Sequence, residues 1–454
     1  MIRLTGMSRN FYLYMMWAGI GAATAFGQQG QQDPVFDRIP FEQWLKGKGE
    51  THMRWSAEVT PSRLTVYQRL SVVLFVRVDG AEFVKRSGAG QMVVFIELRD
   101  REDRVFRTHR ALHFEELKNP GGLAAINFEQ YAFIVPGDYQ VAAAIYDTAS
   151  KEHALKRIKL HVPEVAHDPL PNSWHGLPEV EYVTVGDPPD AWYLPDVSSR
   201  LSLPVQNEKP VRVEVVVNES PTELAPGRTG RTMRRNMGNL IPALKVLSQM
   251  EIKNGSINVT LLDLERRKIS FSQEQAGALD WARLRAALLE NDPNQIDVHA
   301  LENHEQNAQF FVSEVRKRLE GTELNGDVPL GLTADPARVL IVLSGPMAFP
   351  KGQDLRPIEA VPEPGTRVLY IRYYPPRPGL GFGPPPELAQ PGLAGRRSVS
   401  QVRPPGVGPG RGPSTEDSLA RTLKPLNPRT FEVMTPMEFR MALAAIITEI
   451  SRSK

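Results

Sequence analysis

The pattern of apolar residues in this chain changes once, at Val211. Upstream of Val211, runs such as LSVVLFVRV (Leu70–Val78) and MVVFIEL (Met92–Leu98) are rich in valine, isoleucine and phenylalanine, as buried strands are. Downstream, strand-like runs alternate with stretches of helical spacing, which is typical of an α/β sheet. A chain of 454 residues is also too long for one ordinary core. We therefore predict a multidomain protein in which an all-β domain precedes an α/β domain.

The upstream half has the pattern of a β-sandwich. Two runs that alternate with period 2 flank Pro136, Gly137 and Asp138, which predicts a turn between two paired antiparallel strands. We predict a sandwich of immunoglobulin or fibronectin type over residues 55–162. Residues 163–209 form a proline-rich inter-domain segment. Because this segment contains Trp174 and Trp192, we expect it to pack across the joint between the two domains.

The downstream half contains six predicted strands, and predicted helices separate them except between the second and the third and between the fourth and the fifth. In chain order the strands are VRVEVVV, INVTLLDL, KISF, ARVLIVLS, RVLYIRYY and RTFEVM. The helix after the first strand is expected to run from about Leu240 to Met250, with Asn239 as its N-cap. The last helix is expected after Thr435, which has capping-box spacing to Glu438.

A stretch rich in proline and glycine interrupts the downstream half. Residues 375–416 hold 11 Pro and 9 Gly in 42 residues, a composition that cannot bury a core and predicts a disordered insertion. The predicted α/β domain is accordingly divided into a first part, residues 210–374, and a last part, residues 417–454.

The first 27 residues have the features of a secretion signal peptide. Arg3 and Arg9 precede an apolar run of 16 residues, Phe11–Phe26, which ends among small residues suited to cleavage. The run is shorter than the roughly 20 residues that a membrane-spanning helix needs. We expect cleavage and a periplasmic or secreted protein with no stable membrane span, the alternative being that the segment is retained as an anchor. Residues 28–54 then form an N-terminal segment before the sandwich.

Composition excludes several classes of function. The chain has 54 basic and 52 acidic residues, a formal net charge of +2, so no global field points to nucleic acid as a partner. It has no cysteine, which excludes disulfides, zinc–thiolate sites and thiol nucleophiles. No Walker loop, G-x-S-x-G elbow or H-E-x-x-H motif occurs, and we predict no catalytic residue.

Four further polar residues have spacings that fit no compact metal-ligand set: His161, His167, Asp168 and His175.

Three stretches carry a resemblance to a known family. The first strand runs into Asn-x-Ser-x-Thr in VRVEVVVNESPT (Val211–Thr222), a later strand reads RVLIVLSGP, and the chain ends in LNPRTFEVMTPMEFRMALAAIITEI and four more residues. With these, residues 210–452 resemble a von Willebrand factor type A (VWA) domain, and the whole chain resembles exported VWA-related proteins of acidobacteria. The resemblance implies a doubly wound, Rossmann-type, mostly parallel sheet of strand order 3-2-1-4-5-6. Ligands of such sheets bind where the order reverses, at the carboxyl ends of strands 1 and 4.

In VWA domains that bind ligand through a metal ion, Asp-x-Ser-x-Ser ends the first strand and a second Asp follows the fourth. Here Asn218 replaces the first Asp, Ser220 and Thr222 keep hydroxyls, and Ser344 has no carboxylate beside it. Because Mg²⁺ needs anionic oxygen, the resemblance implies a degenerate site with no metal and no other cofactor. Ser220 and Thr222 would be Mg²⁺ ligands only in the alternative of a functional site. Glu219 is expected to point to the opposite face of the strand end.

An arginine-rich stretch, GRTGRTMRR, follows the first strand and is predicted to lie in the long loop before its helix. Its arginines are Arg228, Arg231, Arg234 and Arg235. Arginine binds carboxylates and phosphates without any metal. We hypothesise that an anionic group of a protein partner docks on these arginines and on Ser220 and Thr222. The alternative is a solvated basic loop balanced by Glu219 and Glu223.

The function predicted from these features is that of an exported, non-enzymatic protein-binding or scaffold protein with a degenerate VWA-like metal site. Two alternatives from other classes remain. One is an envelope-associated hydrolase, for which the sequence does not reveal a pair of carboxylates in one cleft. The other is a glycan-binding β-sandwich protein in which the VWA-like half is structural.

Overall fold

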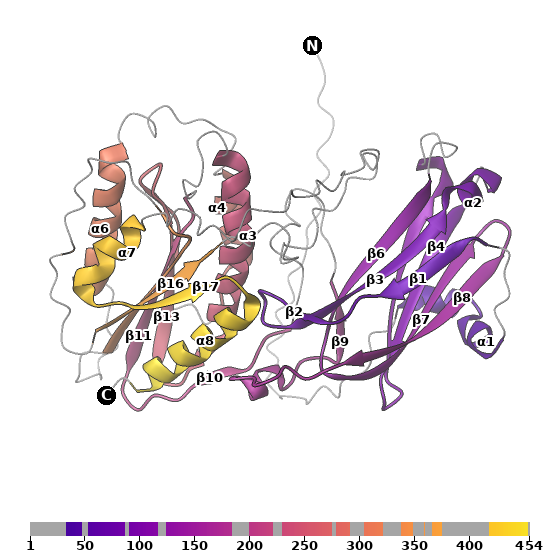
Figure 1. The fold of residues 1–454 in the computed structure, drawn as a ribbon, viewed down its shortest axis with the longest axis horizontal. Helices are drawn as coiled ribbons and strands as arrows, with labels where there is room; N and C mark the ends of the chain where they lie inside the picture. The colour runs from indigo at the N-terminus through magenta and orange to yellow at the C-terminus, as the bar shows by residue number, and fades with distance from the viewer. Residues whose placement is uncertain are drawn as a thin grey trace, which may run out of the picture.

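The computed structural model describes residues 33–47, 53–86, 90–116, 124–183, 199–220, 229–274, 278–290, 304–320, 337–347, 358, 366–374 and 417–452. The predicted signal peptide and the predicted insertion at 375–416 lie outside the described residues. Two bodies of structure lie side by side along the longest axis, one built from antiparallel strands and one from a parallel sheet with helices (Figure 1). Of the helices that are described, none has both the length and the apolar character needed to cross a bilayer.

The N-terminal body is a sandwich of two antiparallel sheets, as predicted. The first sheet has the order β1-β3-β6-β9, with β2 paired to β3. Its strands are β1 (Trp55–Val59), β2 (Arg63–Leu64), β3 (Leu70–Asp79), β6 (Ala125–Ile134) and β9 (Val180–Tyr182). The second sheet has the order β5-β4-β7-β8. Its strands are β4 (Gln91–Arg99), β5 (Val105–His113), β7 (Gly137–Asp147) and β8 (His153–Val162), and the short helices of this body are α2 (Gly80–Lys85) and η2 (Phe114–Glu116).

The two strands that flank the Pro136 turn are not paired, so the prediction of a hairpin there was wrong. β6 belongs to the first sheet and β7 to the second, and the chain crosses between the sheets at the turn. The Tyr139 hydroxyl donates to the carbonyl oxygen of Val135 at 3.0 Å and so fixes the corner. This contact is typical of sandwich corners. Period 2 identifies the face that each strand buries, but it does not identify the neighbouring strand.

A segment before β1 adds a third layer to the sandwich. Residues 33–47, which we call the N-terminal strap, contain the 3-10 helix η1 (Pro34–Arg38) and the helix α1 (Phe41–Lys46). Phe36, Phe41 and Trp44 of the strap are buried against the outer face of the β5-β4-β7-β8 sheet. Part of the segment predicted to precede the sandwich therefore packs on it.

The C-terminal body is a six-stranded sheet of order β14-β13-β11-β15-β16-β17. All neighbours pair in parallel except β13 and β14, which are antiparallel. When these six strands are numbered in chain order, the sheet order is 3-2-1-4-5-6, the order that the VWA resemblance implies. The strands are β11 (Val211–Asn218), β13 (Gly255–Asp263), β14 (Lys268–Gln273), β15 (Ala337–Ser344), β16 (Arg367–Tyr373) and β17 (Arg429–Val433).

Helices cover both faces of this sheet (Figure 1). The face nearer the sandwich packs against α3 (Thr229–Leu247), α4 (Trp281–Glu290) and α8 (Pro436–Ser451), and the far face packs against α6 (His304–Glu320), α7 (Ser418–Leu423) and η6 (Lys424–Leu426). Side chains alternate along β11. Val215 and Val217 belong to the core on the side of α3, α4 and α8, and Val216 belongs to the core on the side of α6 and α7. The capping box predicted for Thr435 and Glu438 is present at the start of α8.

The helix after β11 begins earlier than predicted. α3 starts at Thr229, ten residues before the predicted N-cap Asn239 and with Pro242 in its interior. The predicted N-cap Asn239 placed Pro242 in the first turn, where a proline is tolerated, whereas inside a helix it removes one backbone hydrogen bond and clashes with the preceding turn. Burial of Leu240, Ile241 and Leu244 in the core outweighs that local cost.

The inter-domain segment packs against both bodies, as predicted from its tryptophans. It contains η4 (Pro171–Trp174), β9 and β10 (Leu203–Val205), and β10 pairs in parallel with β12 (Met250–Ile252). Trp174 contacts the core of the sandwich and the core of the α/β body. Its indole nitrogen donates to the backbone oxygen of Gln68 at 2.8 Å. Trp192 lies outside the described residues.

Candidate functional site

Three neighbouring parallel strands of the α/β sheet end in polar residues. Asn218 ends β11, Asp263 ends β13 and Ser344 ends β15. Their exposed fractions are 1%, 2% and 0%, so these polar groups are removed from solvent. With Glu219 and Ser220, which follow β11 and are also buried, we call them the strand-end cluster. Buried polar groups need hydrogen-bond partners, and the partners determine what this cluster can bind.

The Asn218 side chain connects β11 to β15. Its Nδ2 donates to Ser344 Oγ at 2.9 Å and lies 3.5 Å from Met347 Sδ. Its Oδ1 accepts from the backbone N–H of Ser220 at 3.1 Å. Ser344 Oγ in turn donates to the backbone oxygen of Gly345 at 2.7 Å. Both ends of the amide are thus used within the protein, and three of the predicted site residues are brought together.

The Ser220 hydroxyl connects β11 to the turn after β13. Its oxygen accepts from the backbone N–H groups of Leu264 at 2.5 Å and Glu265 at 3.2 Å. It also lies 3.5 Å from Asp263 Oδ1. Because a hydroxyl oxygen has two lone pairs, these two amides occupy the positions that a metal ion would need.

The Asp263 carboxylate is held by Arg266, three residues further along. Its Oδ1 accepts from the Arg266 backbone N–H at 3.0 Å, and its Oδ2 lies 3.2 Å from Arg266 Nη1. The side chains of both residues are largely buried. The negative charge of Asp263 is therefore neutralised inside the turn.

Glu219 reaches toward the edge strand β14. Its carboxylate accepts a hydrogen bond from the Ser270 hydroxyl, and Asp263, Lys268 and Arg266 are its other charged neighbours. Burial raises the pKa of the Glu219 carboxyl to about 7, and the nearby Asp263 charge adds to this effect.

The described residues at the strand ends do not fit the metal site that the VWA resemblance would suggest. Asn218 directs an amide N–H₂ group to Ser344, and N–H donors do not bind cations. Ser220 is occupied by backbone amides. The expectation that the site lacks negative oxygen altogether needs correction, because Asp263 and Glu219 supply two buried carboxyls from β13 and from the end of β11. Among the described residues there is no group of three or more histidine, aspartate or glutamate side chains placed to hold a metal.

The predicted arginines lie elsewhere than expected. Arg231, Arg234 and Arg235 belong to the first two turns of α3 and not to a loop, because that helix starts at Thr229. Arg228 and Thr222 lie outside the described residues.

Asp263, Ser270 and Met347 were not predicted as members of the site. Asp263 had a signal in the sequence, because it ends the apolar run INVTLLD as Asn218 ends VRVEVVVN. The carboxyl ends of neighbouring parallel strands meet at one edge of the sheet. Ser270 and Met347 had no comparable signal, because their proximity depends on the antiparallel return of β14 and on the path of the chain after β15.

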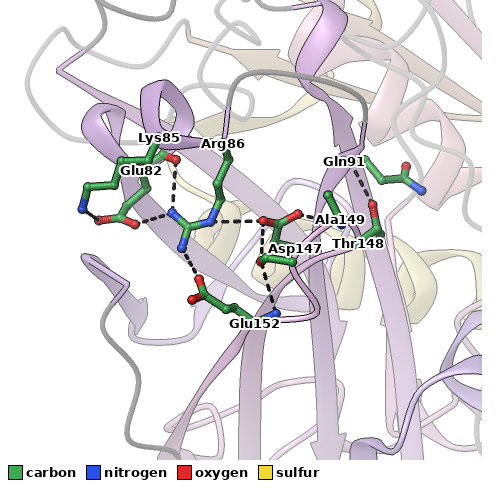
Figure 2. Close-up of polar contacts among 9 residues, drawn as sticks. Glu82, Lys85, Arg86, Gln91, Asp147, Thr148, Ala149 and Glu152 are labelled. Atoms are coloured by element: carbon green, nitrogen blue, oxygen red, sulfur yellow. Dashed lines mark hydrogen bonds and ion pairs between the residues drawn. The ribbon is translucent and has the colours of Figure 1, made fainter.

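A second group of carboxylates lies in the sandwich, around Arg86 (Figure 2). The guanidinium contacts Glu82 in the first turn of α2, Asp147 at the end of β7 and the neighbouring Glu152. Glu82 and Asp147 have side chains only 1% exposed. Burial acts to raise the pKa of Glu82, but hydrogen bonds from Arg86 and Lys85 outweigh it, and the net pKa is lowered. Glu82 is therefore ionised and paired at neutral pH, which suits a structural ion cluster and not a general acid.

Two of the four polar residues that were considered as metal ligands in the sequence pair with different partners. His161 pairs with Asp138, with 2.5 Å between Nδ1 and Oδ1. Asp168 pairs with Arg440 of α8. For His161, His167, Asp168 and His175, the expectation that their spacing does not make a metal site stays a prediction.

Comparisons with known proteins give only distant similarities. No family model matches the chain, and no curated protein matches it. A Bordetella pertussis protein described as ApaA is 12% identical, with a TM-score of 0.16, over 25% of this chain and 97% of that one. A β-glucosidase from Listeria innocua in complex with glucose is 14% identical, with a TM-score of 0.15, over 26% of this chain and 17% of the enzyme. A glycosyl hydrolase family 2 member from Bacteroides cellulosilyticus is 10% identical, with a TM-score of 0.18, over 72% and 42% of the two chains. Similarities this low support no argument about function.

Proposed function

We propose that the protein is an exported, non-enzymatic binding or scaffold protein whose C-terminal half is a doubly wound VWA-type domain with a degenerate metal site. The strand order 3-2-1-4-5-6, with the third strand antiparallel and helices on both faces, supports the family assignment. The N-terminal sandwich is proposed to be of the immunoglobulin or fibronectin type. The corner contact of Tyr139 with Val135 supports this.

One observation is the main support for the proposal that the domain binds its partner without a metal ion. The Asn218 amide donates to Ser344 Oγ across the carboxyl ends of strands 1 and 4, where sheets of this order bind ligands. Mg²⁺ requires oxygen ligands that are free to turn toward it. Here the amide and the two hydroxyls are bound to one another or to the backbone. The strand-end cluster thus joins the carboxyl ends of these strands through hydrogen bonds within the protein.

The partner in this proposal is a protein that presents a carboxylate or phosphate group. Arg231, Arg234 and Arg235 follow the N-terminus of α3, which succeeds β11 along the chain. The partial positive charge of a helix N-terminus adds to that of the arginines. An anionic group can be bound there bidentately, with no cation as intermediary.

Metal titration tests the first part of the proposal. Melting of the full-length protein is followed with increasing Mg²⁺ or Mn²⁺, with EDTA as the reference. We expect no change in Tm at millimolar metal. A site with a Kd of about 10 μM would add about 2.7 kcal/mol of stability at 1 mM ligand, which is readily detected. A rise of several degrees would contradict the degenerate-site proposal.

Charge reversal tests the second part. The variant Arg231→Glu/Arg234→Glu is compared with Arg157→Glu/Lys159→Glu on the exposed edge strand β8, which changes the net charge equally. Tagged proteins are used to recover partners from the native envelope. Partner recovery is expected to fall for the first variant and to persist for the second. Equal recovery with both variants would remove the arginine docking site from the proposal.

A further inference from the structure

The N-terminal strap meets the sandwich through three aromatic side chains. Phe36, Phe41 and Trp44 are 3%, 2% and 7% exposed and pack around Phe95 of β4. Ring centroids lie 4.9 Å apart for Phe36 and Phe95, and 6.2 Å apart for Phe41 and Phe95. Trp44 also stacks on His153 of β8 at 4.3 Å. These contacts make a hydrophobic cluster on the opposite side of the sheet from the main sandwich core.

The sheet beneath the strap has small residues where the rings rest. Ala142 and Ala144 of β7, buried to 6% and 0% exposure, form the floor together with Val93 and Phe95. The intervening Ala143 faces the main core instead. The small side chains of Ala142 and Ala144 leave room for the aromatic rings of the strap, and we call this part of the sheet face the depression. The outer face of this sheet is thus shaped for aromatic side chains.

Charges around the depression complement those of the strap. Asp33 pairs with His109 of β5. Glu42 lies 2.5 Å from Arg107 and 3.8 Å from Arg99. The Arg107 guanidinium also lies over the Phe36 ring, 5.1 Å from its centroid. Glu42 of the strap thus pairs with arginines of the sheet at an exposed position, and these contacts accompany the aromatic packing.

The strap is held to the sandwich by side chains. Among the described residues, its backbone hydrogen bonds run within the strap, for example from Phe36 to Asp33 and from Trp44 to Pro40. It belongs to neither sheet ladder. Its two helices, η1 and α1, have five and six residues. Helices this short are not stable on their own in water. Its conformation thus depends on the surface it covers, as that of a bound peptide does.

We propose that the outer face of the β5-β4-β7-β8 sheet is a peptide-binding surface for the strap sequence, and that the strap of a second copy of the chain can replace the chain's own. The second copy is the favoured occupant because it presents the same aromatic spacing and the same acidic groups. The tether gives the chain's own strap a high effective concentration, so exchange requires that the intramolecular contact be weakened. Exchange of one identical element between copies leaves both sheet ladders intact.

Two complementary full-length variants test this proposal. Phe41→Ala/Trp44→Ala removes the anchors of the strap and leaves an open face, making an acceptor. Ala144→Leu fills the depression, so that the chain's own strap cannot seat, making a donor. Each variant alone is expected to be monomeric by light scattering. Their mixture is expected to form a one-to-one heterodimer, in which the donor strap seats on the acceptor face.

A third variant gives the matched control. A donor that carries Trp44→Ala in addition to Ala144→Leu should bind the acceptor about tenfold more weakly or worse, because one buried aromatic side chain is lost. A labelled peptide of residues 33–47 should bind the acceptor and should bind the wild-type chain much more weakly. A mixture that stays monomeric while both variants keep the sandwich fold would overturn the proposal, as would a donor whose affinity for the acceptor is unchanged by the loss of Trp44.

Hydrogen exchange on the wild-type protein covers the case in which a variant fails to fold. A strap that detaches without unfolding the sandwich should exchange its amides at least about tenfold faster than β4 does. Equal exchange rates in the strap and in β4 would mean that the strap opens only with the whole domain. That result would overturn the proposal.

Discussion

The Arg440 guanidinium is bound by the Asp168 carboxylate, 272 positions earlier in the chain, with Nε–Oδ1 and Nη2–Oδ2 distances of 2.5 and 2.7 Å. Arg440 is 0% exposed and also donates to the Leu170 backbone oxygen and to Ser173 Oγ. Its guanidinium lies 4.7 Å from the centroid of the Trp174 ring. Because Arg440 belongs to α8 and its partners belong to the segment that leaves the sandwich, this pair fixes the two bodies to each other.

Substituting Asp168 should destabilise the protein more than substituting Arg440. Asp168→Asn leaves a buried guanidinium without its counter-ion and should destabilise the protein by roughly 3–5 kcal/mol. Arg440→Met should cost less, because it removes the buried charge and leaves a carboxylate that is partly exposed. Thermal melting of both variants and of the double variant provides the measurement. The double variant is expected to resemble Arg440→Met.

The exposed pair Arg429 and Glu449 is the matched control for the joint. Arg429 is 51% exposed, and Arg429→Met should change stability by no more than about 1 kcal/mol. If Asp168→Asn were as mild as Arg429→Met, the buried pair would not hold the joint.

Ser220→Ala should destabilise the α/β body although it removes a single oxygen atom. The backbone N–H groups of Leu264 and Glu265 lose their acceptor in a buried turn. An unsatisfied buried donor costs about 1–3 kcal/mol. The measurement is the midpoint of chemical denaturation. Ser313→Ala, at an exposed helical position of α6, serves as the control and should leave the midpoint nearly unchanged.

Stability should fall as the pH rises through the interval set by Glu219. Burial raises the pKa of its carboxyl from 4.5 to about 7 in the folded protein. Between these values the folded chain holds a proton that the unfolded chain has released, so unfolding becomes more favourable as pH increases. Glu219→Gln should flatten this dependence, with a gain at pH 8 on the order of 3 kcal/mol at most. Denaturation midpoints measured from pH 4 to pH 8 test this, and an unchanged profile in the variant would contradict it.

Arg86→Met should destabilise the sandwich by roughly 3–5 kcal/mol, because Glu82 and Asp147 would lose their buried counter-ion. The pKa of Glu82 is lowered in the folded state, so its contribution is present above its unfolded pKa and is lost as pH falls through the folded value. The difference between wild type and variant should therefore narrow in acid. Melting at pH 7 and pH 3 measures this. Lys85→Met, at a 61% exposed position, is the control and should cost about 1 kcal/mol or less.

Local pattern was sufficient to predict most elements of the α/β body. ARVLIVLS was predicted as a strand and is β15 over the same residues, because a continuous apolar run bounded by polar residues has few other uses. The start of α8 was also predicted, because the capping residues Thr435 and Glu438 act within one helical turn. The start of α3 was missed, because tertiary burial overrides the local preference of Pro242.

The candidate site was predicted only where its residues are marked by a local pattern in the sequence. Asn218 and Ser344 were identified because each ends an apolar strand, and strand ends are visible in a linear pattern. That Ser220 accepts from Leu264 and Glu265 was not predictable, because the turn after β13 reaches it only in the folded sheet. The charge lost at Asn218 was visible, whereas the charge supplied by Asp263 was recognised only in three dimensions.

Periodicity in the sequence by itself determined the type of each half, the order of strands and helices, and the face that each strand buries. These follow from interactions between residues a few positions apart, whose geometry the backbone fixes. The tertiary structure decided that β6 and β7 enter different sheets, that the strap covers an outer sheet face, and that Asp168 meets Arg440. Each of those pairings joins groups distant in the chain, and their energy depends on burial and charge neutralisation that exist only after the chain has packed.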